Sequence, residues 1–185
     1  LPRFSGDDVP ATAVGATLAI ADKLDTIVGI FSVGQQPSGS RDPFALRRAS
    51  LGVLRIIINR AIDLDLNDAI KIAGNQLKLD NKTLEPIRER VLAYVLGRFN
   101  SWYREEGLSP EIFLSVAALD LSNPLDIDSR VKAVSSFTSL PESQDLAAAN
   151  KRVSNILSKQ LKGQNVSPLK TSLLIDEAEI ELSNA

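Results

Sequence analysis

Apolar residues recur along this chain at steps of three and four positions, which is the spacing of one face of an α-helix. The clearest stripe consists of Leu84, Ile87, Val91, Val95, Phe99 and Trp102. No segment alternates apolar and polar residues with the period of two that a half-buried strand requires. The pattern predicts an all-α fold without a sheet, with about seven helices near residues 12–31, 43–62, 67–78, 83–105, 109–119, 124–138 and 142–160.

Three of these helices share a start signal, in which a residue with a side-chain acceptor precedes a proline. The three residues are Asp42, Ser109 and Asn123. Proline is favoured at the first helical position, because the amide that it lacks would have no helical partner there. Asp, Ser and Asn are favoured one position earlier, where a side-chain oxygen accepts from the first free amides. We therefore expect these three residues to be N-caps.

The segment LDLSNP at residues 119–124 interrupts the helical pattern and predicts a division of the chain. Residues 1–119 would form one helical region, and residues 124–185 would begin a second, more basic and incomplete one. The segment GQNVSPLKTS at residues 163–172 is rich in turn-forming residues, which predicts a mobile C-terminal tail. The chain starts at Leu1 without an initiator methionine, and we interpret it as part of a longer protein.

Composition narrows the classes of function. The chain has 185 residues, 44% of them hydrophobic, and contains no histidine, cysteine or methionine. The usual general base, the thiol nucleophile and the soft metal ligands are therefore missing, which argues against zinc sites and His-based triads within these residues. No apolar run approaches the roughly 18 residues of a membrane span, so we expect a cytoplasmic protein without a membrane partner.

The overall charge of −2 conceals two basic segments. Residues 41–60 carry five arginines and a single acidic residue, Asp42. Residues 131–170 carry six lysines and arginines against Glu142 and Asp145. Clustered cations of this kind suit a phosphate backbone, because they release its condensed counterions. Both segments are therefore candidate contacts for a nucleic acid.

The loop before the first basic segment contains GQQPSG, which resembles a phosphate-binding loop in composition alone. It lacks the Gly-Lys-Ser/Thr ending of a P-loop, and no strand precedes it. On the helix that follows, one face carries Arg48, Gly52, Arg55 and Asn59, and Arg47 lies beside this face. A phosphate backbone could approach this face closely across the glycine. The alternative is a solvated face with local ion pairs.

The second basic segment predicts an amphipathic helix. Its packing face would consist of Leu146, Ala149, Val153, Ile156 and Leu157. Arg152, Asn155 and Lys159 would lie together on another face, which could contact RNA or simply face water.

Two further groups of residues leave the choice of function open. Asp22 and Asp25 lie three positions apart, so their carboxylates share a side of a helix and could hold a metal ion or divide acid and base roles. The alternative is a polar edge of a buried helix. Near Arg98, Trp102 belongs to the apolar stripe, whereas Tyr103 could stack on an unpaired base or pack in the core.

Four strings in this order resemble the β subunit of the bacterial heterotetrameric glycyl-tRNA synthetase: ADKLDTIVGIF, DPFALRRASLGVLRIIINRAIDL, LGRFNSWYREEG and LAAANKRVSNIL. The resemblance implies that this chain recognises tRNA while the α subunit holds the glycine and ATP site with its magnesium ion. It therefore implies no cofactor and no catalytic residue in this chain. It also implies an HD-like helical region in residues 1–119 and the start of a helical anticodon-binding domain in residues 124–185.

The resemblance and the basic segments together give an expected set of tRNA-binding residues: Arg41, Arg47, Arg48, Arg55, Lys151, Arg152, Asn155 and Lys159. The expected partners are tRNA and the α subunit, and neither DNA nor a membrane. Two alternatives stay open. By resemblance, Asp22 stands where HD phosphohydrolases have a metal-binding aspartate, so the region could be the remnant of such an enzyme, although the histidines of that site are missing. It could also be a structural scaffold that docks the α subunit.

Overall fold

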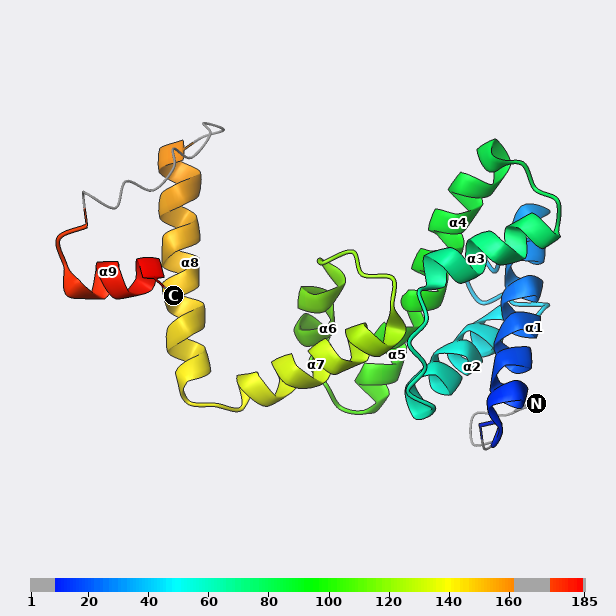
Figure 1. The fold of residues 1–185 in the computed structure, drawn as a ribbon, viewed down its shortest axis with the longest axis horizontal. Coiled ribbons are helices and arrows are strands. Elements are labelled where there is room, and N and C mark those ends of the chain that lie inside the picture. The colour runs from blue at the N-terminus through cyan, green and yellow to red at the C-terminus, as the bar shows by residue number, and fades with distance from the viewer. Residues whose placement is uncertain (1–8, 162–173, 185) are drawn as a thin grey trace. The chain divides into compact units, whose positions relative to one another are not determined.

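The structure is a computed structural model that describes residues 9–161 and 174–184. Apart from an isolated bridge between Ser38 and Arg41, every regular element in these residues is a helix, which confirms the all-α prediction (Figure 1). The helices are α1 Ala13–Ser32, α2 Leu46–Asn59, α3 Leu66–Gln76, α4 Asn81–Leu96, α5 Arg98–Glu105, α6 Pro110–Ala117, α7 Pro124–Thr138, α8 Glu142–Leu161 and α9 Glu177–Asn184.

The chain divides into two compact units, Leu1–Phe137 and Thr138–Ala185. The segment at residues 119–124 does separate α6 from α7, but α7 packs with the first unit, because Ile127 and Val131 are part of its core. The compact division therefore falls one helix later than the predicted boundary. The assignment of the two regions to an HD-like and an anticodon-binding domain stays a prediction.

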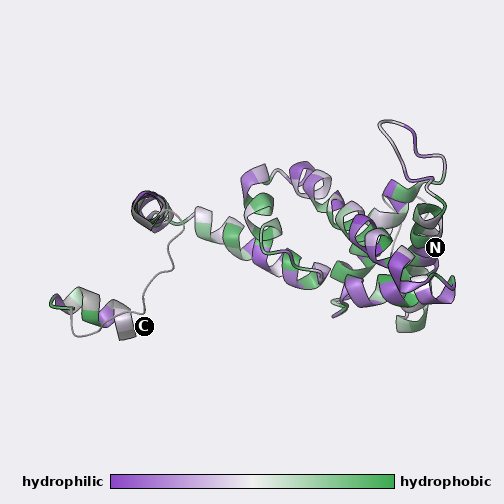
Figure 2. Cartoon of the chain, turned by 90° about the horizontal axis from the view of Figure 1, so that it is seen from above, coloured by the Kyte–Doolittle hydropathy of each residue, from purple (hydrophilic) through white to green (hydrophobic). Residues whose placement is uncertain are grey.

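The core of the first unit forms around α1, which packs against α2, α3 and α4 (Figure 1). Ala19, Ile27 and Val28 of α1 have no more than a trace of exposed surface. They meet the apolar stripe predicted near residues 83–105, whose members from Leu84 to Phe99 are all buried, with Trp102 partly buried at its end. Purple and green alternate along these helices in Figure 2, as expected for amphipathic helices packed on one core.

The stripe lies on two helices rather than one, because the helix breaks at Gly97. A Cβ atom at this position would lie 2.9 Å from the carbonyl oxygen of Ala93, closer than a side chain tolerates. Glycine therefore permits the tighter turn that separates α4 from α5. The stripe continues across the break because Phe99 remains fully buried.

The three predicted N-caps have three different outcomes. Asn123 is an N-cap, since its Oδ1 accepts from the amides of Leu125 and Asp126. Ser109 occupies the N-cap position of α6, but its hydroxyl donates to the carboxylate of Glu111 instead of accepting from a helix amide. That bond lowers the pKa of Glu111 below its ordinary value.

Asp42 is not at the N-cap position, and the prediction that its helix begins at residue 43 is wrong. Residues 42–45 form a turn closed by a bond from the amide of Ala45 to the carbonyl of Asp42, and α2 begins at Leu46. The carboxylate of Asp42 reaches across this turn and accepts from the amides of Leu46 at 2.8 Å and Arg47 at 3.0 Å. The capping chemistry is thus present, but it comes from the first residue of the turn rather than from the N-cap itself.

The sequence patterns did not predict α9. The expected mobile segment at residues 163–172 lies outside the described residues, as do Lys162 and Lys170 of the second basic segment. Within the described residues, no helix has both the length and the apolar character needed to cross a membrane.

Candidate nucleic-acid interface

The loop between α1 and α2 is held in place by Arg47. Its guanidinium donates to the backbone carbonyls of Gly39 and Ser40, while the backbone of Ser38 pairs with that of Arg41 in both directions. Arg47 is partly buried, whereas Arg41 is exposed at the end of the loop. Arg47 therefore positions the loop, and Arg41 presents its charge to solvent.

On α2, the predicted face of Arg48, Gly52 and Arg55 exists, and a side chain from a neighbouring helix lies over its glycine. The side chain of Lys23 from α1 crosses this position, such that a Cβ atom at Gly52 would lie 2.9 Å from Lys23 Cε and 3.7 Å from Nζ. A phosphate group that approached across Gly52 would therefore meet the side chain of Lys23 as well as the two arginines. The glycine makes room for a third cation, which comes from the neighbouring helix.

We call Lys23, Arg48 and Arg55 the α2 basic surface. Arg48 is exposed, and Lys23 and Arg55 are partly exposed. Asn59, the last member of the predicted face, instead donates from Nδ2 to the carbonyl of Arg55 and so completes the end of the helix. The surface can offer several N–H donors to phosphate oxygens, from side chains on two helices.

Arg98, on α5, is a further cation of the first unit, which the spacing of residues on α2 could not reveal. Its guanidinium carbon lies 5.0 Å from the centre of the Tyr94 ring, and the ring of Phe31 lies 5.2 Å from that of Tyr94 between centroids. Burial raises the pKa of Tyr94, and the Asp42 carboxylate raises it further, while the charges of Arg98 and Arg47 lower it. The charge of Arg98 therefore acts on the same ring as the charges of Asp42 and Arg47.

Tyr103 belongs to the core and cannot stack on a base. It is 2% exposed, stacks on Phe99 at 5.2 Å, and donates from its hydroxyl to Asp128 Oδ1 at 2.9 Å. The other oxygen of Asp128 accepts from Lys132 Nζ at 2.6 Å, which leaves the buried carboxylate with two partners on α5 and α7. Burial and the charge of Asp128 together raise the pKa of Tyr103.

The second predicted set lies on α8, in the other compact unit. Lys151, Arg152, Asn155 and Lys159 are all exposed and line one shallow concavity with Ala148 and Ile156. The predicted packing face, which adjoins the concavity at Ile156, is exposed as well, with Leu146 at 59% and Val153 at 53%. The structure therefore groups these four residues on one face of α8.

The pair of Asp22 and Asp25 lines a groove between α1 and α3. In the described part of the chain, no hydrogen bond or ion pair engages either carboxylate. The same residues contain no group of three or more potential ligands that could hold a metal ion. Whether these two side chains form a polar helix edge or part of a metal site stays a prediction.

Comparison with known proteins gives a consistent set of matches. A family model described as glycyl-tRNA synthetase beta subunit matches residues 1–118. Three similar proteins, each named glycine–tRNA ligase beta subunit, come from Chromohalobacter salexigens (50% identical), Photobacterium profundum (51%) and Salmonella typhi (48%). The matches cover 98–100% of this chain but 26–27% of each relative, so the chain spans about a quarter of their length.

Proposed function

The chain belongs to the glycyl-tRNA synthetase β-subunit family, and from this premise we propose that it is a tRNA-binding part of that enzyme. It makes and breaks no covalent bond in this role. Its cations neutralise phosphates of the tRNA and so fix the position of the substrate. Glycine, ATP and the magnesium ion would bind at the α subunit, in a cytoplasmic complex of the two subunits.

The observation that carries the proposal is that Lys23 of α1 lies over Gly52, while Arg48 and Arg55 share the face of α2 on which this glycine stands. A phosphate group placed beside these cations would accept charge-assisted hydrogen bonds from side chains of two helices. Arg41 extends the same charge along the loop, where it is also exposed.

The experiment that tests the proposal is a double substitution, Arg48→Ala with Arg55→Ala, in the intact synthetase. Each charge-assisted bond contributes about 1.5–3 kcal/mol, so loss of two contacts should weaken tRNA binding by roughly tenfold or more. The dependence of log K on log salt should flatten by about one to two units, because fewer counterions are released. Activation of glycine with ATP should be unchanged.

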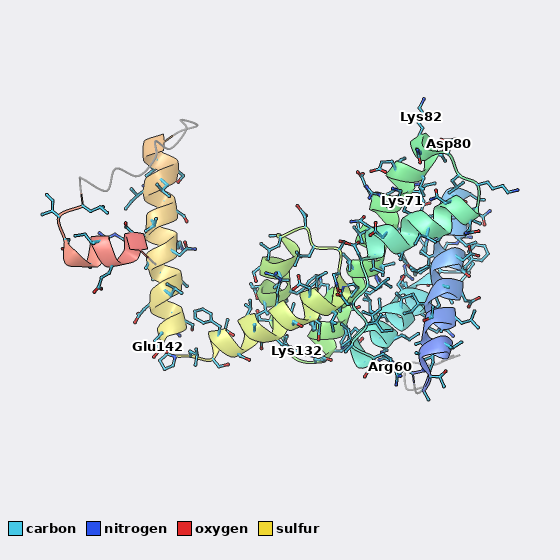
Figure 3. All side chains as sticks on the ribbon, in the orientation of Figure 1. Arg60, Lys71, Asp80, Lys82, Lys132 and Glu142 are labelled. Atoms are coloured by element: carbon cyan, nitrogen blue, oxygen red, sulfur yellow. The ribbon has the colours of Figure 1, made fainter. Side chains whose placement is uncertain are left out.

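A matched control replaces Lys71 and Lys82 with alanine. Both are exposed lysines, on α3 and at the start of α4, and Lys82 points away from the body of the unit in Figure 3. This variant removes the same total charge and should leave the affinity and the salt dependence nearly intact. If the arginine and lysine variants behave alike, the α2 basic surface is merely solvated, and the cations of α8 become the candidates for tRNA contact.

A further inference from the structure

A groove between α1 and α3 has no part in the proposed tRNA contacts. Its volume is ≈ 590 Å³, compared with ≈ 400 Å³ for an apolar hollow beside α4 and α6, and its lining is mostly aliphatic. The side chains that line it from α1 include Thr17, Leu18 and Leu24, and those from α3 include Ile72 and Gln76. The segment before α3 contributes Ile62 and Leu64.

Large apolar side chains on the walls of this groove are exposed to solvent rather than buried. Leu18 is 68% exposed and Ile72 is 62% exposed, although each lies on a helix whose opposite face is fully packed. Contiguous apolar patches of this kind mark interaction sites, because water contact with them is unfavourable. A groove of this kind also suits a helix, because the apolar face of one helix can pack between two other helices.

The charges at the edge of the groove indicate what kind of helix would fit. Asp22 and Asp25 both line it, and in the described residues neither carboxylate has a partner. Burying them against a purely apolar surface would cost free energy, since a carboxylate needs a donor or a cation when it loses water. An occupant with a lysine or arginine at the edge of its apolar face would supply one.

We propose that this groove holds another segment of the same β polypeptide: a helix with an apolar face and a basic residue beside it. The length of the family supports an intrachain occupant, since this chain spans 26–27% of its relatives and most of their polypeptide lies outside the matched part. A segment of the same chain is also present at a high effective concentration, which favours it over a separate protein. The proposal is independent of tRNA binding.

The test is thiol labelling of full-length β chains that carry Leu18→Cys or Ile72→Cys. Residues 1–185 contain no cysteine, and the parent full-length chain supplies the background rate. For each variant the labelling rate in the native protein is divided by the rate in denaturant. Both thiols should react at least about tenfold more slowly in the native chain, because they are covered until the segment opens. Val14→Cys, on α1 but outside the groove and 78% exposed, is the matched control.

Two results would overturn the proposal. If L18C and I72C react in the native full-length chain about as fast as in denaturant, the groove is open. If protection appears only after addition of the α subunit, the occupant is a different protein. A third variant tests the charge: adding D22K and D25K to L18C should speed labelling, and an unchanged rate would contradict a basic occupant.

Discussion

Two tyrosines of the first unit differ in what their hydroxyl groups contribute. Tyr103 donates to the buried carboxylate of Asp128, whereas the buried hydroxyl of Tyr94 has no hydrogen-bond partner among the described residues. Sequence spacing left the role of Tyr103 open, because nothing local indicates that its partner lies 25 positions later on another helix. Only the packing of α5 against α7 reveals the bond.

This difference predicts unequal effects of the same chemical change. Tyr103→Phe removes one of the two partners of Asp128 and should lower the free energy of unfolding by about 1–3 kcal/mol. Tyr94→Phe removes an unpaired hydroxyl and should leave the free energy of unfolding unchanged or slightly higher. Urea denaturation of both variants measures the difference. Equal effects would contradict the hydrogen bond to Asp128.

Asp80, the N-cap of α4, predicts a dependence of stability on pH. Its carboxylate accepts from the backbone amide of Thr83 at 2.9 Å, and this bond, followed by that of the Thr83 hydroxyl, lowers the pKa of Asp80 below 3.8. Because the pKa of Asp80 is lower in the folded state, its carboxylate stabilises the fold above pH 3.8. This stabilisation is lost as the pH falls through the lower, folded-state pKa. The melting temperatures of the wild type and Asp80→Asn should therefore differ at neutral pH and converge in acid. A constant difference would exclude the carboxylate as the cause.

At the scale of helices, the contact between α3 and α4 depends on a glycine. Gly74 of α3 lies against Leu84, such that a Cβ atom at Gly74 would come within 2.2 Å of Leu84 Cδ1. Gly29 of α1 has much more room, since the nearest atom to a Cβ there is Leu77 Cδ1 at 3.9 Å. The two glycines look alike in sequence, because both stand inside helical patterns.

We expect these two glycines to respond to alanine in opposite directions. Gly74→Ala should lower the free energy of unfolding by about 1–3 kcal/mol, because the extra methyl group overpacks the contact with Leu84. Gly29→Ala should raise it by about 0.5–1 kcal/mol, because alanine restricts the unfolded chain and fits the helix. Thermal unfolding of both variants is the measurement. A stabilising Gly74→Ala would mean that α3 and α4 are not packed this closely.

The helical period and the proline signals predicted most elements, but not every end. Asp42 supplies the expected acceptor, yet α2 starts later because Ala45 adopts a left-handed conformation with φ of 54°. Similarly, the apolar stripe is continuous through Gly97 although the helix is not. Periodicity reports which residues face the core, and it is insensitive to a local change in the backbone that keeps them there.

At the scale of the whole molecule, sequence reasoning found the basic residues but not their arrangement. Arg48 and Arg55 could be grouped because they lie on one helix, where spacing determines the face. Lys23 joins them from the preceding helix, through the space that Gly52 leaves. The groove beside Asp22 and Asp25 was equally out of reach, because a groove between helices depends on how they pack.

The central claim is that tRNA lies on the α2 basic surface, and photocrosslinking tests it most directly. A benzophenone amino acid would replace Asn59, which is exposed on the same face of α2 as Arg48 and Arg55, or Asn81, which is exposed at the start of α4. In the intact synthetase, irradiation with glycine tRNA should give a crosslink from position 59 that weakens with added salt, and little from position 81. Equal crosslinking from the two positions, or none from position 59 in an active enzyme, would contradict the claim.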